Sequence, residues 1–141
     1  MSARDLARAL AAGRIAIGAA LLAAPRLSLG MWIGRAGAAG AVAAPARALG
    51  IREVMLGSMA LHAADIPRGG PVLLRALAVC DGIDLLATLA LRRSLPGPGR
   101  ALVAAMAGAA AAAQLWAAAQ LDAAPQDGSS PSRPIRRAAI R

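Results

Sequence analysis

The sequence predicts an all-α integral membrane protein, a four-helix bundle with short loops and a disordered C-terminal tail. The chain of 141 residues fits a single domain and is 58% hydrophobic. Its apolar residues are almost all aliphatic, because it has two Trp and no Phe or Tyr, whereas soluble cores take much of their volume from aromatic rings. These residues gather in four runs of about 20 residues, the length at which an α-helix crosses the hydrocarbon core of a bilayer.

The first run covers residues 6–24. Arg14 interrupts it, and it stops at Pro25. Residues 27–44 then contain four glycines and Trp32, and they are too polar and glycine-rich for another span. This composition predicts a loop with a short helix at the membrane interface, where tryptophan side chains are enriched.

The second and third runs cover residues 46–64 and 71–91. The turn-forming stretch 65–70, which contains Pro and two Gly, separates them. Both runs are apolar in composition but contain charged residues, and the arginine pair at 92–93 marks the end of the third. We therefore predict two spans whose charged side chains need partners inside the bundle.

The fourth run, residues 101–121, has no charged residue, and its only polar side chains are Gln114 and Gln120. From residue 123 to 141, Pro, Ser, Gln, Asp and Arg dominate, which is typical of a disordered tail. We expect the arginines of this tail to touch anionic lipid. Nucleic acid is not an expected partner, because the chain lacks aromatic stacking residues and a recognisable binding fold.

Two other interpretations of the runs remain open. Two arginines before the apolar stretch 15–24 are also typical of a signal peptide, but Arg14 lies against that stretch and Pro25 makes a poor cleavage site. A soluble Ala-rich bundle is the second, because Ala contributes little to membrane insertion. Against it, no run has the wide polar stripe that a surface helix of a soluble bundle needs.

The charges in the inner parts of the runs balance. Three positive side chains accompany three negative ones: Arg14, Arg52 and Arg75, and Glu53, Asp81 and Asp84. An isolated ionised side chain at the bilayer centre costs about 2.5–3.5 kcal/mol, so these charges permit insertion only in pairs. The balance predicts a buried charge network of Arg14, Arg52, Glu53, Asp81 and Asp84.

Helical spacing predicts which helix faces meet. Glu53 belongs to a stripe of small residues on the second run, and Asp81 and Asp84 belong to a stripe on the third. Both acidic stripes can face inward only if an arginine lies between them or one carboxyl is protonated. Arg75, near the start of the third run, is predicted to reach the interface instead. The acids are interpreted either as a static network that sets helix register or as a proton- or cation-binding site.

Other chemistry-bearing residues form no recognisable site. Cys80 is the single cysteine, so the chain has no intramolecular disulfide and, with His62 its single histidine, no zinc-binding spacing. No nucleophile is spaced with a base, and the glycines at 34, 37 and 40 do not match a dinucleotide-binding pattern. We therefore expect no catalytic residue, no metal and no cofactor.

Two short motifs lie on the second and third runs: Gly50-Ile51-Arg52-Glu53 with Gly57, and Arg75 with Asp81-Gly82-Ile83-Asp84. With these motifs, residues 13–91 resemble small actinobacterial four-helix membrane proteins of unknown function, DoxX-like in layout. The resemblance implies the four-helix layout and places the acidic residues and Arg52 in the family pattern. It implies no activity.

We expect a multi-pass protein of the bacterial cytoplasmic (inner) membrane with a non-enzymatic structural or accessory role. All 16 basic residues are Arg, which with the Ala excess is typical of a GC-rich bacterial genome. The alternative is a small proton- or cation-coupled transporter that uses Glu53, Asp81 and Asp84. The lipid bilayer is the expected partner, and a homo-oligomer or another membrane protein remains open.

Overall fold

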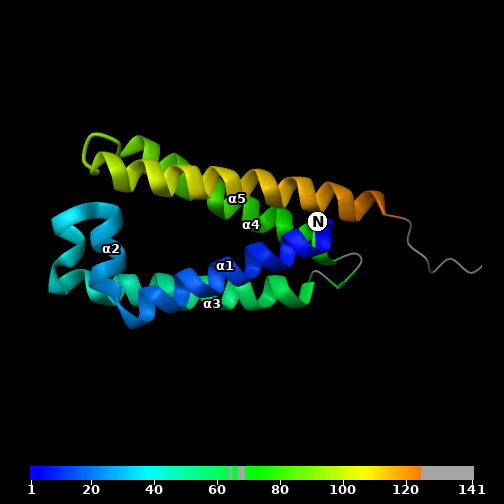
Figure 1. Ribbon diagram of the computed structural model, residues 1–141, viewed down its shortest axis with the longest axis horizontal. Helices are drawn as coiled ribbons and strands as arrows, with labels where there is room; N and C mark the ends of the chain where they lie inside the picture. The colour runs from blue at the N-terminus through cyan, green and yellow to red at the C-terminus, as the bar shows by residue number, and fades with distance from the viewer. Residues whose placement is uncertain (64, 67–68, 125–141) are drawn as a thin grey trace, which may run out of the picture.

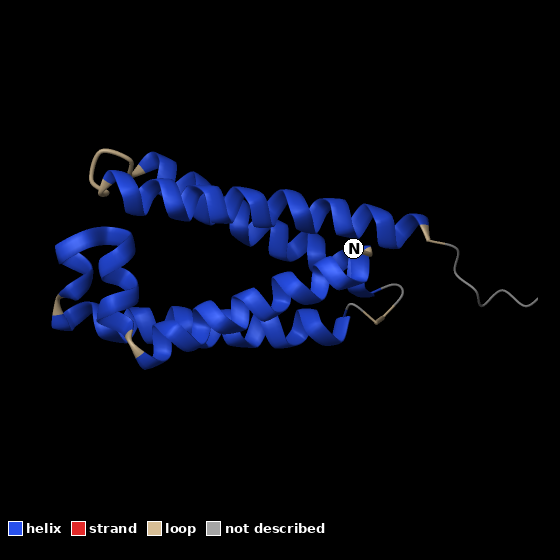
Figure 2. Cartoon of the chain, viewed as in Figure 1, coloured by secondary structure: helices blue, strands red, loops and turns tan. Residues whose placement is uncertain are grey.

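The computed structural model describes residues 1–63, 65–66 and 69–124, in which every regular element is a helix and the rest are loops and turns (Figure 2). The all-α class that the sequence predicts is confirmed. Helix α5 ends at Ala123, the first residue of the predicted tail, and Ala124 caps it, while residues 125–141 of that tail lie outside the described residues. The helices are, in order, α1 (Ala3–Ala23), α2 (Pro25–Ile33), the 3₁₀ helices η1 (Gly34–Ala38) and η2 (Gly40–Val42), α3 (Ala43–Ala63), α4 (Gly69–Ala90) and α5 (Gly97–Ala123).

The long helices form two antiparallel hairpins, α1 with α3 and α4 with α5 (Figure 1). The hairpins meet where α1 packs on α5 and α3 packs on α4. They lie close together near the N-terminus, and at the opposite end of the bundle α2 lies between them. We call this opposite end, made of residues 24–47 and 91–100, the α2 end.

Local sequence sets the ends of the helices. The Ser2 hydroxyl accepts a hydrogen bond from the Asp5 backbone N–H, and the Asp5 carboxylate accepts one from the Ser2 backbone N–H, so a capping box begins α1. Proline begins α2, at a position where the missing N–H leaves no bond unmade. Pro98 lies in the first turn of α5, so this helix begins before the apolar run at residue 101 from which we predicted it.

Glycines allow α1 and α3 to approach closely. A Cβ atom on Gly57 would lie 2.7 Å from the carbonyl oxygen of Ala11, and one on Gly18 would lie 2.6 Å from that of Gly50. Real Cβ atoms do not approach other atoms so closely, so the two backbones can pack at this separation only with glycine at both positions. The close packing brings the charged side chains of the two helices within reach of each other.

Polar side chains lie inside the bundle, and many aliphatic ones lie outside. Arg14, Glu53 and Asp81 are buried, as are Thr88 and Gln114. On α3 and α4, exposed aliphatic side chains recur at helical spacing: Ile51, Met55 and Met59, and Val72, Val79, Ile83 and Leu86. Charged residues are almost never fully buried unless they are paired, so the three buried charges need partners inside the bundle.

Two helices in the described part of the chain, α1 and α5, are long and apolar enough to cross a membrane. Each has a mean hydropathy of 1.6 over its most apolar stretch, and only 28% and 17% of those stretches are buried. The core helix of a soluble protein would be mostly buried, so the low burial sets both helices apart from that case, whereas the position of α1 near the N-terminus is also that of a signal sequence. Helices α3 and α4 are not among the candidates, and each contains three charged residues.

Candidate functional site

Arg14 joins the two hairpins through two carboxylates. From α1, its Nη1 donates to Glu53 Oε2 of α3 at 2.6 Å, and its Nη2 donates to Asp81 Oδ1 of α4 at 2.6 Å. All three side chains are at least nine-tenths buried. Because each hydrogen bond is also an ion pair, Arg14 supplies a charge-assisted bond to each of two other helices.

Helix α5 completes this cluster with an uncharged side chain. Gln114, which is 1% exposed, donates from its Nε2 to Asp81 Oδ2. Sequence reasoning singled out Gln114 only as a polar residue in the fourth run. Its position in an otherwise apolar helix was the one signal available, and Gln120 carried the same signal although its side chain is exposed. Each of the four long helices thus contributes one residue to the buried cluster, which we call the Arg14 cluster: Arg14, Glu53, Asp81 and Gln114.

Arg52 extends the cluster toward the surface. Its Nη2 donates to Glu53 Oε1 at 3.0 Å and to Asp84 Oδ2 at 3.2 Å. The structure therefore brings together all five residues of the predicted network: Arg14, Arg52, Glu53, Asp81 and Asp84.

The prediction that all five are buried is wrong for two of them. The side chains of Arg52 and Asp84 are 43% and 40% exposed. The reason is helical geometry. Arg52 is the neighbour of Glu53 in the sequence and so points away from the inward face, whereas Asp84, three residues after Asp81, lies at the edge of that face. These two residues form the outer edge of the network, and Arg14 forms its centre.

The network contains three carboxylates and two guanidinium groups. With all groups ionised it carries one more negative charge than positive charge. Two of the carboxylates are buried, where an unpaired charge is costly. In the described part of the chain no group of three His, Cys, Asp or Glu side chains could hold a metal ion. The arrangement can therefore fix helix positions through ion pairs, and its excess negative charge can be neutralised by a proton or a cation.

Arg75 lies away from the network. It donates to Asp122 near the end of α5, and both side chains are about half exposed. At the same end of the bundle, Arg8 of α1 pairs with Asp65 at 2.7 Å. Arg75 therefore lies near the end of the bundle and outside its charged interior, which is consistent with the prediction that it reaches the membrane interface.

The single cysteine and histidine also lie outside the network. The exposed His62 ring has its Nδ1 2.8 Å from the Ser58 carbonyl oxygen, one turn earlier on α3. Cys80, next to Asp81, is partly buried. Neither residue shares a hydrogen bond with a carboxylate of the cluster in the described structure.

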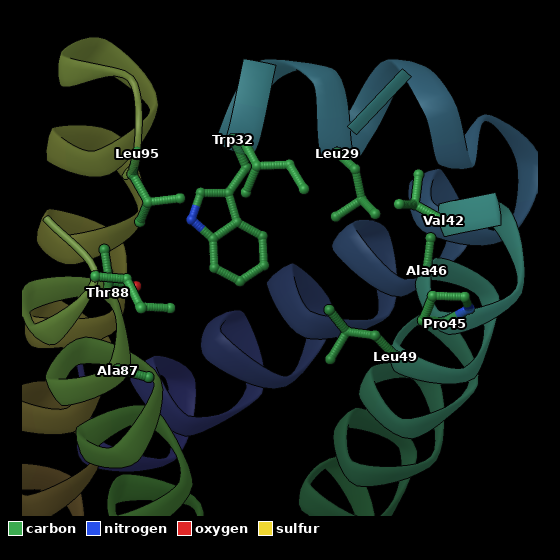
Figure 3. Close-up of a pocket in the computed structure, with 11 residues that line it drawn as sticks. Leu29, Trp32, Val42, Pro45, Ala46, Leu49, Ala87, Thr88 and Leu95 are labelled. Atoms are coloured by element: carbon green, nitrogen blue, oxygen red, sulfur yellow. The ribbon is translucent and has the colours of Figure 1, made fainter. Parts of the chain in front are cut away.

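A second feature is an apolar cavity of about 360 Å³ at the α2 end, which we call the Trp32 cavity. Side chains of α2, α3 and α4 line it, together with residues of the turn after α4 (Figure 3). The Trp32 ring extends from α2 into the space between α3 and α4, facing Thr88 on one side and Leu49 on the other. The sequence predicted that Trp32 lies in a short interfacial helix, but a cavity between hairpins depends on their packing and could not be predicted from local pattern.

Comparisons with known proteins give no further guide to either feature. No family model, curated protein or solved structure matches the chain. The function must therefore be inferred from the Arg14 cluster, the Trp32 cavity and the distribution of apolar surface.

Proposed function

We propose that the chain is a multi-pass protein of the bacterial cytoplasmic membrane in which α1, α3, α4 and α5 all cross the bilayer. The reversed polarity of the bundle supports this proposal. Buried Arg14, Glu53 and Asp81 lie inside, and exposed Ile, Leu, Met and Val side chains cover the outer faces of α3 and α4. In water such a large apolar surface would drive association, whereas lipid chains solvate it at no cost.

Ion pairing explains how α3 and α4 can lie in a bilayer despite their charges. An isolated ionised side chain at the bilayer centre costs about 2.5–3.5 kcal/mol. With two or three such groups in one helix, the free-energy cost of inserting that helix would be prohibitive. Here Glu53 and Asp81 both accept hydrogen bonds from Arg14, so neither helix presents a bare inner charge to lipid. The DoxX-like layout, which we also propose for this chain, is consistent with four spans.

We infer that the protein acts as a structural or accessory membrane module without catalysis. The Arg14 cluster supports this role, because it holds one residue from each long helix and so fixes the relative positions of both hairpins. A buried cluster of this kind is a device for specifying one helix arrangement among several. Within the described residues, the groups that touch the buried acids are arginines and an amide, which do not form a nucleophile and base pair.

A small proton- or cation-coupled transporter is the second candidate. The excess of one carboxylate in the network favours it. The net charge of Glu53, Asp81 and Asp84 with the two arginines is zero only if one proton or monovalent cation is bound. Titratable acids facing the inside of a membrane bundle are typical of proton pathways.

Membrane fractionation tests the first proposal. The full chain is expressed, membranes are washed with alkaline carbonate, and the protein is expected to stay in the pellet and to need detergent for release. Recovery in the supernatant without detergent would contradict the membrane location.

The two candidate roles are then separated with Asp84→Asn, because this acid is half exposed and its loss spares the Arg14 contacts. For a structural module, the wild type and Asp84→Asn both keep their fold, and neither shows pH-dependent binding of a ligand. For a transporter, the wild type shows such binding and Asp84→Asn loses it.

A further inference from the structure

We propose that the α2 end of the bundle binds an anionic phospholipid, with one acyl chain in the Trp32 cavity and the phosphate on the arginines around it. This inference rests on the proposed membrane location. Two independent observations support it, an apolar cavity and a group of arginines that have no acidic partner among the described residues, and they lie at the same end of the molecule.

The walls of the Trp32 cavity suit a hydrocarbon chain. They are aliphatic except for the Trp32 ring and Thr88, and the Thr88 hydroxyl already donates to the Asp84 carbonyl oxygen at 2.8 Å. No charged side chain lines the cavity, and its one polar atom without a partner in the described structure is the buried Nε1–H of Trp32, so a strongly polar ligand would exchange most of its hydration for a single donor. An aliphatic chain has no such cost, and it would fill the space between α2 and the two hairpins (Figure 3).

The α2 end is positively charged throughout. Residues 24–47 and 91–100 contain six arginines and no Asp or Glu: Arg26, Arg35, Arg47, Arg92, Arg93 and Arg100. In the described structure none of the six forms an ion pair, whereas at the other end Arg8 pairs with Asp65 and Arg75 pairs with Asp122. A charge group with no ion-pair partner among the described residues is complementary to an anion from outside.

Two of the arginines, both exposed, are the sequence neighbours of residues in the cavity wall. Arg47 follows the wall residue Ala46 on α3, and Arg92 follows the wall residue Leu91 after α4. The Arg92 carbonyl oxygen also accepts a hydrogen bond from Arg100 Nη1 at 2.6 Å, which fixes the turn that carries two of the other arginines. A lipid with a chain between α3 and α4 would therefore place its phosphate among arginines from both hairpins. A neutral lipid would use the cavity but not the charges.

The test uses Trp32 as the reporter of chain binding. The chain has two Trp, and the second, Trp116, is exposed on α5, so Trp116→Leu leaves the cavity residue as the only fluorophore. Purified full-length Trp116→Leu in detergent micelles is titrated with phosphatidylglycerol that carries brominated acyl chains, and in parallel with brominated phosphatidylcholine. We expect phosphatidylglycerol to quench Trp32 at a several-fold lower mole fraction.

Two further variants separate the phosphate from the chain. Arg47→Gln and Arg92→Gln should each weaken quenching by phosphatidylglycerol about five-fold, which corresponds to ~1 kcal/mol per surface charge, and leave phosphatidylcholine unchanged. Ala87→Phe, which puts a ring into the cavity from its α4 wall, should reduce quenching by both lipids. The matched control replaces Arg136 and Arg137 of the tail with Gln and should change neither titration.

Equal quenching by the two lipids, or no effect of Arg47→Gln and Arg92→Gln, would overturn the proposal. An effect of the tail variant alone would also overturn it, because the lipid would then bind at the tail. Carbonate extraction of the same variants keeps this result separate from the membrane location. Protein that stays in the membrane without a preference for phosphatidylglycerol refutes only the lipid site, and protein that is released refutes both.

Discussion

Arg14 and Asp81 lie 67 positions apart in the sequence, and in the fold their Nη2 and Oδ1 atoms are 2.6 Å apart. Both side chains are at least nine-tenths buried, and they belong to different hairpins. The importance of a buried ion pair of this kind for stability becomes clear when one partner is removed. The partner that is left behind is a buried charge without compensation, which typically costs about 3–5 kcal/mol.

Asp81→Asn is therefore expected to lower the free energy of unfolding by about 3–5 kcal/mol, because Arg14 keeps only one of its two carboxylates. Arg14→Gln alone removes the pairs with both Glu53 and Asp81, and in the double variant the Arg14–Asp81 pair is already lost, so the two single losses should not add. Reversible unfolding in mixed micelles measures the four members of this double-mutant cycle. Wild-type stability for every single variant, with no coupling, would falsify the structural role of the Arg14 cluster and favour the transporter.

Glu53 offers a second cycle on the other branch of the network. It accepts from Arg14 and Arg52, so Glu53→Gln weakens two ion pairs and should also lower the yield of folded protein. Adding Arg52→Gln removes the half-exposed positive charge and should recover part of that yield. The amount of folded protein after gel filtration in detergent is the readout. If the double variant is no better than Glu53→Gln alone, Arg52 is not a partner of this acid in solution.

Gln114→Leu should destabilise the bundle by about 1–3 kcal/mol, because it leaves Asp81 Oδ2 buried without its hydrogen-bond donor. The matched control is Gln120→Leu on the same helix, where the side chain is exposed and the change should be neutral. Thermal unfolding of both variants in detergent makes the comparison. Equal effects of the two substitutions would contradict the assigned role of Gln114.

Gly57→Ala is expected to separate α1 from α3, because the added Cβ would lie 2.7 Å from a backbone oxygen, which cannot move aside as a side chain can. Gly82→Ala on α4 is the control, since its Cβ would have no atom within 4 Å. We expect a loss of stability for the first variant and none for the second, measured by unfolding in the same detergent. Separation of α1 from α3 should also weaken the Arg14–Glu53 pair.

The spans predict the sidedness of the chain. Four crossings place both termini on one side of the membrane and the turn at residues 91–96 on the other. Arginine numbers on the two sides are nearly equal, seven against six in the sequence, so the positive-inside bias is small, and we predict cytoplasmic termini. Reporter fusions at residue 141 and within the turn measure this. A periplasmic signal at residue 141 would reverse the orientation, and the same signal at both positions would contradict four spans.

Run length and helical spacing were sufficient to predict the helical class and the residues that meet in the network. Arg14, Glu53 and Asp81 could be found because charges in apolar runs need partners and the spacing of the acids defines a face. The role of Gln114 could not be predicted from the sequence, because the helix is apolar on all sides and its pattern does not show which face is buried. The exposure of Arg52 and Asp84 depends on how the helices are rotated in the bundle. The start of α5 follows from Pro98, a local signal that the apolar run concealed.

The division into two hairpins has a consequence for how the protein assembles during synthesis. The first hairpin brings Arg14 and Arg52 with Glu53, a net charge of one positive unit in its interior, and the second brings Asp81 and Asp84, two negative units. The halves therefore attract each other in a medium of low dielectric constant, where such attraction is strong. A gene split between the codons for residues 66 and 69 should yield two fragments that find each other in the membrane and copurify, and Asp81→Asn in the second fragment should weaken their association.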